Sequence, residues 1–254
     1  MRNSLVAWLG IVLGAVVSGC ALVQTKPSVL ASSLEELAPH ADGDHFVYIW
    51  ERFADGQRLG EGIEVEHVSA TGGGEFEVTV SEDGQPAGRL RVRDDGHALL
   101  LLSEDDLSRN MRLSYDPPLP QLTAPLLAAE QRSEATATVS QLADGHAVGT
   151  VRVTQITQAR AAQDVHSSLG EYKRGVLMHV VRTLYFSEGA TELQSSMMLV
   201  PGIGEVRSEG AASGAPVLRR ALACALIGGH SVGNCQTLQQ RLEKLHDAGP
   251  TDVY

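Results

Sequence analysis

A serine flanked by glycines, in the run Gly229-His230-Ser231-Val232-Gly233, has the residue types and spacing of a catalytic nucleophile. In the Gly-x-Ser-x-Gly motif the serine stands on a sharp turn between a strand and a helix, which exposes its hydroxyl group. A histidine held by an acid removes the hydroxyl proton, and the oxygen then attacks an ester. The motif therefore raises the hypothesis of an esterase centred on Ser231.

The segments around Ser231 do not predict the fold that this motif needs. Residues 216–227 begin with a proline, carry apolar side chains at helical spacing and end at Gly228, which predicts a helix where the motif needs a strand. After the serine, His246 precedes Asp247, whereas such hydrolases place the acid before the histidine. We therefore expect a protein that is not an enzyme, assign no catalytic residue, and keep the esterase as a remote alternative.

Residues 211–254 are predicted to form a C-terminal helical hairpin instead. Residues 228–233 are its loop and Asn234 caps the second helix. Three leucines form the apolar stripe of that helix: Leu238, Leu242 and Leu245. Cys224 and Cys235 stand on either side of the loop, so we expect a disulfide between them, which would stabilise the fold by roughly 3 kcal/mol.

The third cysteine, Cys20, follows a segment with the character of a secretion signal. Arg2 provides a positive charge, residues 5–17 are uncharged and mostly apolar, and Ser18 and Gly19 are small. The apolar stretch is shorter than the roughly 20 residues of a transmembrane helix. These features predict export of the chain.

The run Val17-Ser18-Gly19-Cys20 resembles the lipobox of bacterial lipoproteins. The resemblance implies that residues 1–19 are a signal peptide, and that Cys20 becomes an N-terminus carrying diacylglycerol and an acyl group such as palmitate. Several acyl chains hold a protein stably on a membrane, because each buried methylene contributes about 0.8 kcal/mol. Ala21 follows the cysteine, and by resemblance to the enterobacterial sorting pattern this favours the outer membrane, with the protein facing the periplasm.

The charge balance excludes one class of partner. The chain has 20 basic and 31 acidic side chains, and loss of residues 1–19 removes only Arg2, so the mature net charge is −12. An acidic chain lacks the basic footprint that nucleic acid requires. We expect contact with a membrane through the lipid, and no binding of nucleic acid.

One grouping of side chains has the types that bind metals. His40 and His45 flank Asp42 and Asp44 at the boundary of a predicted tether. The group has neither a sulfur ligand nor a second pair of histidines, so it does not predict a zinc site. We assign no metal and no cofactor.

Residues 45–210 are predicted to form an antiparallel β domain. Apolar and polar side chains alternate from His45 onward, which is typical of strands with one buried face. Glycine-containing turns separate the runs: Asp55-Gly56, Gly72-Gly73-Gly74, Asp83-Gly84 and Asp95-Gly96. On the polar face, cross-strand ion pairs are expected between glutamates and arginines. These are Glu64, Glu66, Glu75 and Glu77 with Arg89, Arg91 and Arg93.

The segments at the edges of this domain have their own predictions. Residues 20–44 are expected to be the lipidated N-terminus and a flexible tether, with the alternative that part of them packs on the domain as an opening helix. Residues 116–120 contain three prolines and should break the sheet. Residues 158–175 are expected to be a long polar loop.

A repeated pattern suggests two related halves. Residues 53–60 and 142–149 share the pattern Ala-Asp-Gly followed by a second glycine, at a constant offset of 89 residues. Each copy follows one predicted strand and precedes another. The sequence therefore predicts two β-halves, residues 45–115 and 132–208, joined through the prolines.

The strand predicted at residues 176–186 is apolar on both faces, so something should cover the second face of the sheet. The helical hairpin is one candidate, and an apolar ligand in a concave half-barrel is the other. The run Val200-Pro-Gly-Ile-Gly-Glu-Val206 resembles a turn near the end of the sheet in secreted bacterial β-proteins, among them relatives of half-barrel lipoprotein carriers. That resemblance implies an antiparallel meander or half-barrel curled over helices.

Three functions are compatible with the sequence. The first is a membrane-anchored envelope lipoprotein that acts as a structural or assembly partner of other envelope proteins, through the charged sheet face or residues 158–175. The alternative is a carrier or binding protein for a lipid or other apolar ligand, whose binding residues are unknown. The remote alternative is the esterase at Ser231.

Overall fold

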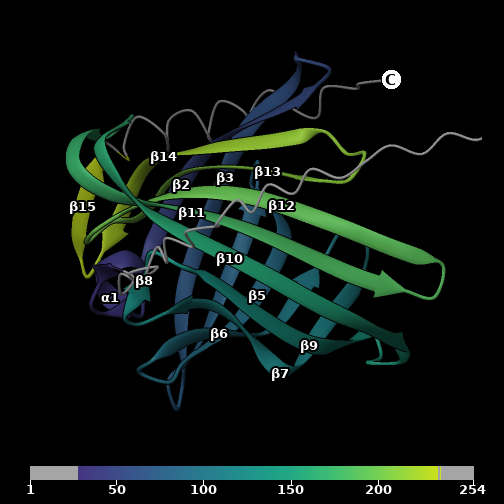
Figure 1. Cartoon of the computed structure of the whole chain (residues 1–254). Coiled ribbons are helices and arrows are strands. Elements are labelled where there is room, and N and C mark those ends of the chain that lie inside the picture. Colours follow the sequence, from purple (N-terminus) through teal and green to yellow (C-terminus); the bar gives the residue numbers. More distant parts are fainter. Residues whose placement is uncertain (1–27, 234, 236–254) are drawn as a thin grey trace, which may run out of the picture.

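The computed structural model describes residues 28–233 and residue 235, and it is a closed antiparallel barrel of 12 strands (Figure 1). The barrel strands are, in order, β2 (His45–Ala54), β3 (Gln57–Gly72), β4 (Glu75–Glu82), β5 (Gln85–Asp94), β6 (Ala98–Asp106), β7 (Met111–Thr123), β9 (Glu130–Gln141), β10 (Ala147–Ser167), β11 (Gly170–Phe186), β12 (Gly189–Val200), β13 (Gly204–Ala212) and β14 (Val217–Ile227). The prediction of a mainly antiparallel β fold is confirmed, but the half-barrel was wrong because β14 pairs with both β13 and β2 and so closes the sheet.

The hairpin turns follow the predicted chemistry. Asp55 and Gly56 join β2 to β3, and Asp83 and Gly84 join β4 to β5, with positive φ at all four residues. Two consecutive residues with positive φ make the turn type whose twist matches that of paired strands. The Asp-Gly pairs therefore position the hairpins as expected.

The N-terminal segment caps one end of the barrel, at the left in Figure 1. Strand β1 (Val29–Ala31) pairs with β8 (Leu126–Leu127), and helix α1 (Leu34–Leu37) buries its two leucines in the core. Ser33 caps the helix by accepting a hydrogen bond from the Glu36 amide. For residues 28–44 the alternative of an opening helix packed on the domain is confirmed and the flexible tether is not, because the leucines of α1 give this segment an apolar face. Residues 20–27, including Cys20, lie outside the described part.

Among the described helices, none has the length and apolar character needed to cross a membrane.

Strand β7 continues through the prolines that were predicted to break it. Its pairing with β9 runs from Met111 only to Asp116, and beyond that point it pairs on one side with β6. Pro117 and Pro118 fall where the register with β6 shifts, so neither has to donate a ladder hydrogen bond. The prediction was wrong because a strand paired on one side tolerates proline.

The predicted C-terminal helical hairpin is not supported within the described residues. Residues 217–227 form β14, and residues 230–233 form the short strand β15 (His230–Gly233), which pairs with it. A β-bulge at Leu222 and Cys224 shifts the register by one residue, and this interrupts the alternation in a way that imitates helical spacing. Asn234 and the leucines at 238, 242 and 245 lie outside the described residues.

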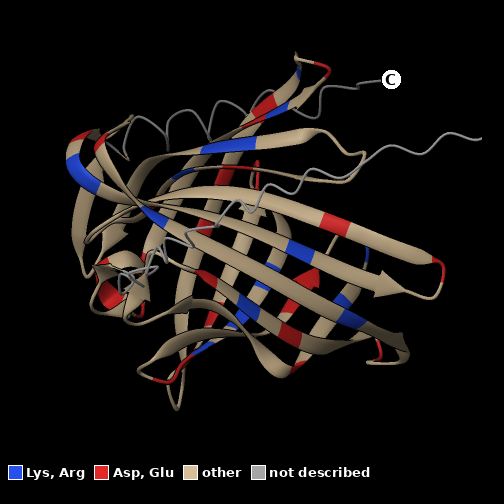
Figure 2. Ribbon diagram, in the orientation of Figure 1, with Lys and Arg blue, Asp and Glu red and all other residues tan. Residues whose placement is uncertain are grey.

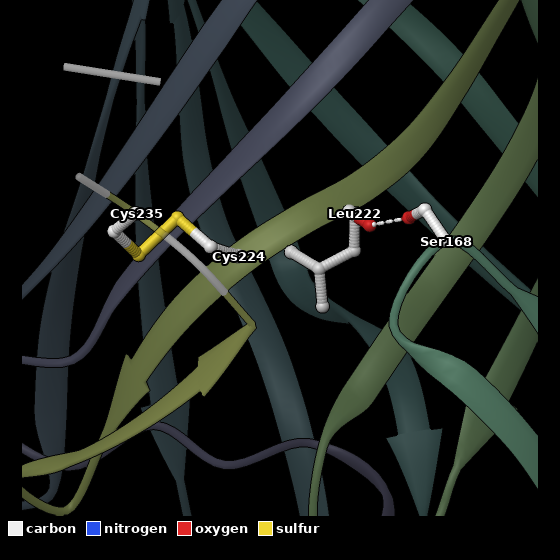
Figure 3. Close-up of a disulfide and its surroundings, with 4 residues drawn as sticks. All are labelled: Ser168, Leu222, Cys224 and Cys235. Atoms are coloured by element: carbon white, nitrogen blue, oxygen red, sulfur yellow. Dashed lines mark hydrogen bonds between the residues drawn. A yellow bond between two sulfur atoms is a disulfide. The ribbon is translucent and has the colours of Figure 1, made fainter. Parts of the chain in front are cut away.

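The predicted disulfide is present although its helical setting is not. Cys224 on β14 is fully buried and bonds to Cys235, with the two Cα atoms 5.3 Å apart (Figure 3). The hairpin geometry of β14 and β15 brings the cysteines together, as the helical hairpin was expected to do.

Residues 158–175 form the end of the β10–β11 hairpin, and not the long polar loop that was predicted. This end curls over the outside of the barrel (Figure 1), where the Ser168 hydroxyl donates to the carbonyl oxygen of Leu222 (Figure 3). Val165, Leu169 and Leu177 pack there with Met198 and other residues of the barrel wall. The outer apolar face of β11 is thus covered in part by the chain's own hairpin.

The two copies of the repeated pattern occupy matching places in the barrel. Asp55-Gly56 forms the turn between β2 and β3, and Asp144 and Gly145 lie between β9 and β10. Strand β2 begins one run of six barrel strands and β9 begins the other. This placement is what two related halves would produce, and the repeat itself stays a prediction.

Candidate binding cavity

The barrel encloses a cavity of about 480 Å³. Most of its lining residues are apolar and come from strands all around the barrel. The principal apolar ones are Phe46, Val68, Phe76, Val78, Leu90, Val92, Leu99, Leu122, Met178, Val180, Leu193, Met197 and Leu199. Ligand sites usually have volumes of roughly 300–1,000 Å³ with mainly apolar walls and a few polar groups, so this cavity has the size and composition of a binding site.

The capping segment forms one end of the cavity. Leu37, Pro39 and His40 line it there. The His40 ring stands edge-on to Phe76 with the ring centres 4.8 Å apart, and its Nε2 lies 3.0 Å from a carboxylate oxygen of Asp94. The segment is therefore fixed to the barrel wall by polar as well as apolar contacts.

Arg220 of β14 holds three glutamates on one wall of the cavity. Its Nη1 donates to Glu64 and, at 2.7 Å, to Glu66, while Nε and Nη2 donate to the two oxygens of Glu205 at 2.8 and 3.0 Å. The guanidinium also stacks over the Tyr48 ring, 4.5 Å from its centre. We call these five residues the Arg220 cluster; it contains one cation and three carboxyl groups.

Burial sets the protonation of this cluster. Desolvation raises the pKa of Glu66 to about 7, with the Arg220 charge opposing the rise and Glu64 and Glu205 adding to it. Burial by itself would lower the pKa of Arg220, but the surrounding carboxylates outweigh it and raise that pKa, so Arg220 stays charged. Burial also raises the pKa of Tyr48, which stays neutral.

A second arginine, Arg182 of β11, also lines the cavity and organises the side chains around it. Its Nε donates to Gln155 at 3.1 Å, Nη1 to Glu104 at 3.3 Å, and Nη2 to Gln121 at 3.3 Å. Tyr115 donates to Glu104, and burial, with the Glu104 charge, raises the tyrosine's pKa. This Arg182 cluster has one cation and one carboxylate, so it is close to neutral.

Gln155 ties the Arg182 cluster to the strand wall. It is almost fully buried, and its Nε2 donates to the carbonyl oxygen of Pro120 at 2.7 Å. This contact lies where β7 and β9 no longer pair through their backbones. Side-chain hydrogen bonds thus replace the missing ladder beside the cavity.

The structure places Glu64 and Glu66 inside the barrel, not on the outer polar face that was predicted for them. A two-residue turn at Asp55 and Gly56 would place Tyr48 opposite Ile63, but a β-bulge at Arg52 and Phe53 places Tyr48 opposite Glu64. A shift of one residue turns every later side chain to the other face. The bulge has no clear signal in the sequence. Arg220 was missed because its segment was predicted to be a helix, and Arg182 was missed because the strand at residues 176–186 was interpreted as apolar on both faces.

The other predicted ion pairs lie outside, where they were expected. Arg91 approaches Glu75 at 2.7 Å, and Arg89 approaches Glu77 at 3.6 Å. Arg89 also lies 3.5 Å from Asp105 of β6. Figure 2 shows acidic and basic residues interspersed along the barrel strands in this view.

The serine motif does not have the arrangement of a nucleophile elbow. Ser231 lies within the exposed strand β15, after a turn at Gly228 and Gly229 that joins two strands. Among the described residues, no hydrogen bond joins its hydroxyl to a histidine or an acid. The strand that precedes it is present, contrary to our prediction of a helix, but Ser231 lies inside the next strand, β15, and not at a turn between a strand and a helix.

Asp42 and Asp44 have structural roles. Asp44 accepts hydrogen bonds from the amides of Ala41 and Gly228, and Asp42 accepts one from Ala70. Within the described part of the chain, no group of three or more metal-binding side chains comes together. These aspartates fasten the capping segment to the barrel.

The solved structures of two other proteins are similar to this chain. One is described as an exported protein with a YmcC-like fold from Bacteroides fragilis, with 14% identity and a TM-score of 0.45 over 73% of this chain and 96% of that chain. Another is described as a lipoprotein from Parabacteroides distasonis, with 12% identity and a TM-score of 0.42 over 72% of this chain and 95% of that chain. No family model and no curated protein matches this chain. At such low identity, neither similarity indicates what this chain binds.

Proposed function

We propose that this chain is a lipid-anchored protein of the bacterial cell envelope that binds an amphipathic small molecule inside its barrel. The observation that carries the proposal is the cavity of about 480 Å³ with mainly apolar walls and two charged clusters. Burial of an apolar ligand surface gives roughly 25 cal/mol per Å² before the costs of association. An apolar body against the walls and a polar group near the clusters would satisfy both parts of the lining.

The arrangement of the charged groups supports binding over a purely structural interior. A barrel interior filled for stability alone would place apolar side chains at these positions, because a buried ion pair is often no more stable than a packed apolar replacement. Arg220 and Arg182 instead face a space large enough for a ligand. Polar groups of this kind orient a ligand and provide specificity.

The alternative role as an assembly partner has less support. Residues 158–175, one of its two expected contact regions, pack on the chain's own barrel through Val165 and Leu169. The other region, the charged outer face of β4 and β5, pairs its own charges. A partner remains part of the proposal only as the protein that would deliver or receive the ligand.

Anchoring through Cys20 at the outer membrane, facing the periplasm, belongs to the same proposal. It is supported by the run Val17-Ser18-Gly19-Cys20. A protein held at a membrane surface has access to amphipathic molecules in that membrane. Labelling with radioactive palmitate, lost in Cys20→Ala, tests the anchor separately from the binding.

The binding test compares two tryptophan substitutions on neighbouring positions of β11. Val180 lines the cavity, whereas Val181 points to the other face of the strand. Val180→Trp should fill the cavity and reduce the fluorescence of the apolar dye N-phenylnaphthylamine, and it should reduce the lipids extracted from the purified chain. Val181→Trp adds the same side chain and should leave both signals unchanged.

Circular dichroism and thermal unfolding show whether each variant keeps its fold. Binding of the dye by a folded Val180→Trp protein at the wild-type level would contradict the proposal. So would the absence of both dye binding and copurified lipid in the wild-type chain.

A further inference from the structure

Negative charges outnumber positive charges around the cavity, and the charges belong to the two arginine clusters. The Arg220 cluster brings three carboxyl groups to one guanidinium, and the Arg182 cluster brings one carboxylate to one guanidinium. Four acids thus face two cations. The excess negative charge would be felt strongly by any charged ligand group, because charges are poorly screened away from water.

The two arginines have little capacity left for an anion. Arg220 uses Nε, Nη1 and Nη2 on the three glutamates of its cluster, and Nε also approaches the hydroxyl of Ser208 at 3.0 Å. Arg182 likewise uses all three nitrogens on neighbouring side chains. An incoming carboxylate or phosphate would have to displace these contacts and would meet the glutamates at close range.

Glu66, by contrast, has an acceptor available. It lines the cavity and keeps 17% of its side-chain surface accessible. Among the described residues, its hydrogen bond to Arg220 uses only Oε1, which leaves Oε2 without a donor. Its cross-strand neighbour is Phe46, and Phe46 and Tyr48 place aromatic rings on the same wall. Carboxylates and aromatic faces are the groups that proteins use to hold amines.

We infer that the ligand is a cationic amphiphile, whose ammonium group binds at Glu66 of the Arg220 cluster while its apolar part lies against Phe76, Met178 and Val180. This inference rests on the proposed binding function and names its ligand class. The same charges select against anionic lipids such as fatty acids and phosphatidic acid. Selection of this kind comes from repulsion of the wrong ligand as well as attraction of the right one.

The test uses three probes that share one alkyl chain and differ in the charge of the head: decylamine, decanol and decanoate. Titration calorimetry on the purified full chain at pH 8, below the micelle concentrations, should give the order decylamine, decanol, decanoate from tightest to weakest. We expect decylamine to bind about tenfold more tightly than decanoate. Decanoate that binds as tightly as decylamine would overturn the inference.

A pair of variants locates the ammonium site. Glu66→Gln should weaken decylamine binding about tenfold and leave decanol binding unchanged, since glutamine keeps the shape and loses the charge. Glu75→Gln, on the outer face, makes the same chemical change and should alter neither. Equal weakening of decylamine and decanol in Glu66→Gln would contradict the assignment.

The outcomes separate the two proposals. Binding of decanol without preference for decylamine would overturn the ligand class and leave the binding function standing. Failure of all three probes to bind would overturn both. The order of the three probes on the wild-type chain decides the ligand class even if Glu66→Gln does not fold.

Discussion

The inner Arg220 cluster and the outer face of β4 and β5 are built from the same two residue types and behave differently. Outside, Arg91 and Glu75 form an exposed pair of one cation and one anion. Inside, Arg220 is shared by three glutamates and largely removed from bulk water. Exposed pairs usually contribute less than about 1 kcal/mol, whereas breaking a buried pair costs several, because a buried charge is left without a partner. The position in the barrel, more than the residue type, determines what each pair does.

The largest difference should appear when the shared cation is removed. Arg220→Met removes the only cation of the Arg220 cluster and leaves Glu64, Glu66 and Glu205 close together. We expect the free energy of unfolding at pH 8 to fall by about 3–5 kcal/mol. Urea denaturation measures this value. Stability should partly return near pH 4, where the carboxyl groups take up protons. A loss below about 1 kcal/mol would mean that the inner cluster behaves like an exposed one.

The next effect concerns the pH dependence of stability. The folded chain holds the Glu66 proton up to about pH 7, while an unfolded glutamate loses it near its ordinary value of 4.5. Between these values the folded state binds the additional proton, so the contribution of Glu66 to the free energy of unfolding falls as the pH rises. Below pH 4.5 both states are protonated and the contribution is constant.

In Glu66→Gln the side chain at position 66 does not titrate, so its contribution to the free energy of unfolding should not fall with rising pH. Between pH 4 and pH 8, the free energy of unfolding of the variant should rise relative to that of the wild type by on the order of 2–3 kcal/mol. Arg220, Glu64, Glu205 and Tyr48 are still in place in this variant. Urea denaturation at both pH values gives the difference. Glu75→Gln is the exposed control, and identical pH profiles for wild type and Glu66→Gln would refute the expectation.

The smallest effect is expected outside the barrel. Arg91→Met removes the pair with Glu75 but leaves that carboxylate in water, so the free energy of unfolding should change by less than about 1 kcal/mol. High salt should abolish even this change. A loss as large as that of Arg220→Met would remove the distinction between the two regions.

The sequence predicted the features that depend on local chemistry. Asp55-Gly56 and Asp83-Gly84 form the hairpins that their backbone preferences require, and Cys224 and Cys235 meet because few residues separate them. The outer pairs of Arg89 and Arg91 also lie where alternation placed them. Residues close together in the sequence are enough to specify these features.

The features that depend on register were not predictable in the same way. The bulge at Arg52 and Phe53 turns Glu64 and Glu66 inward. The bulge at Leu222 and Cys224 gives β14 an apolar pattern that resembles helical spacing. Closure of the sheet depends on β14, so a half-barrel was predicted because β14 was taken for a helix. The cavity combines residues from nearly every strand, and no local pattern indicates such a set.

Closure also has a consequence for how the chain folds. The last barrel strand pairs with the first, with Val217 opposite Phe53, so the ring is completed only after β14 has been synthesised. Until then β2 and β13 are edge strands whose unpaired backbone groups can pair with other chains. Contacts between such distant segments slow folding, because the entropy of closing the loop is lost before the contact is gained. We therefore expect slow folding and a need for protection by chaperones until the ring has closed.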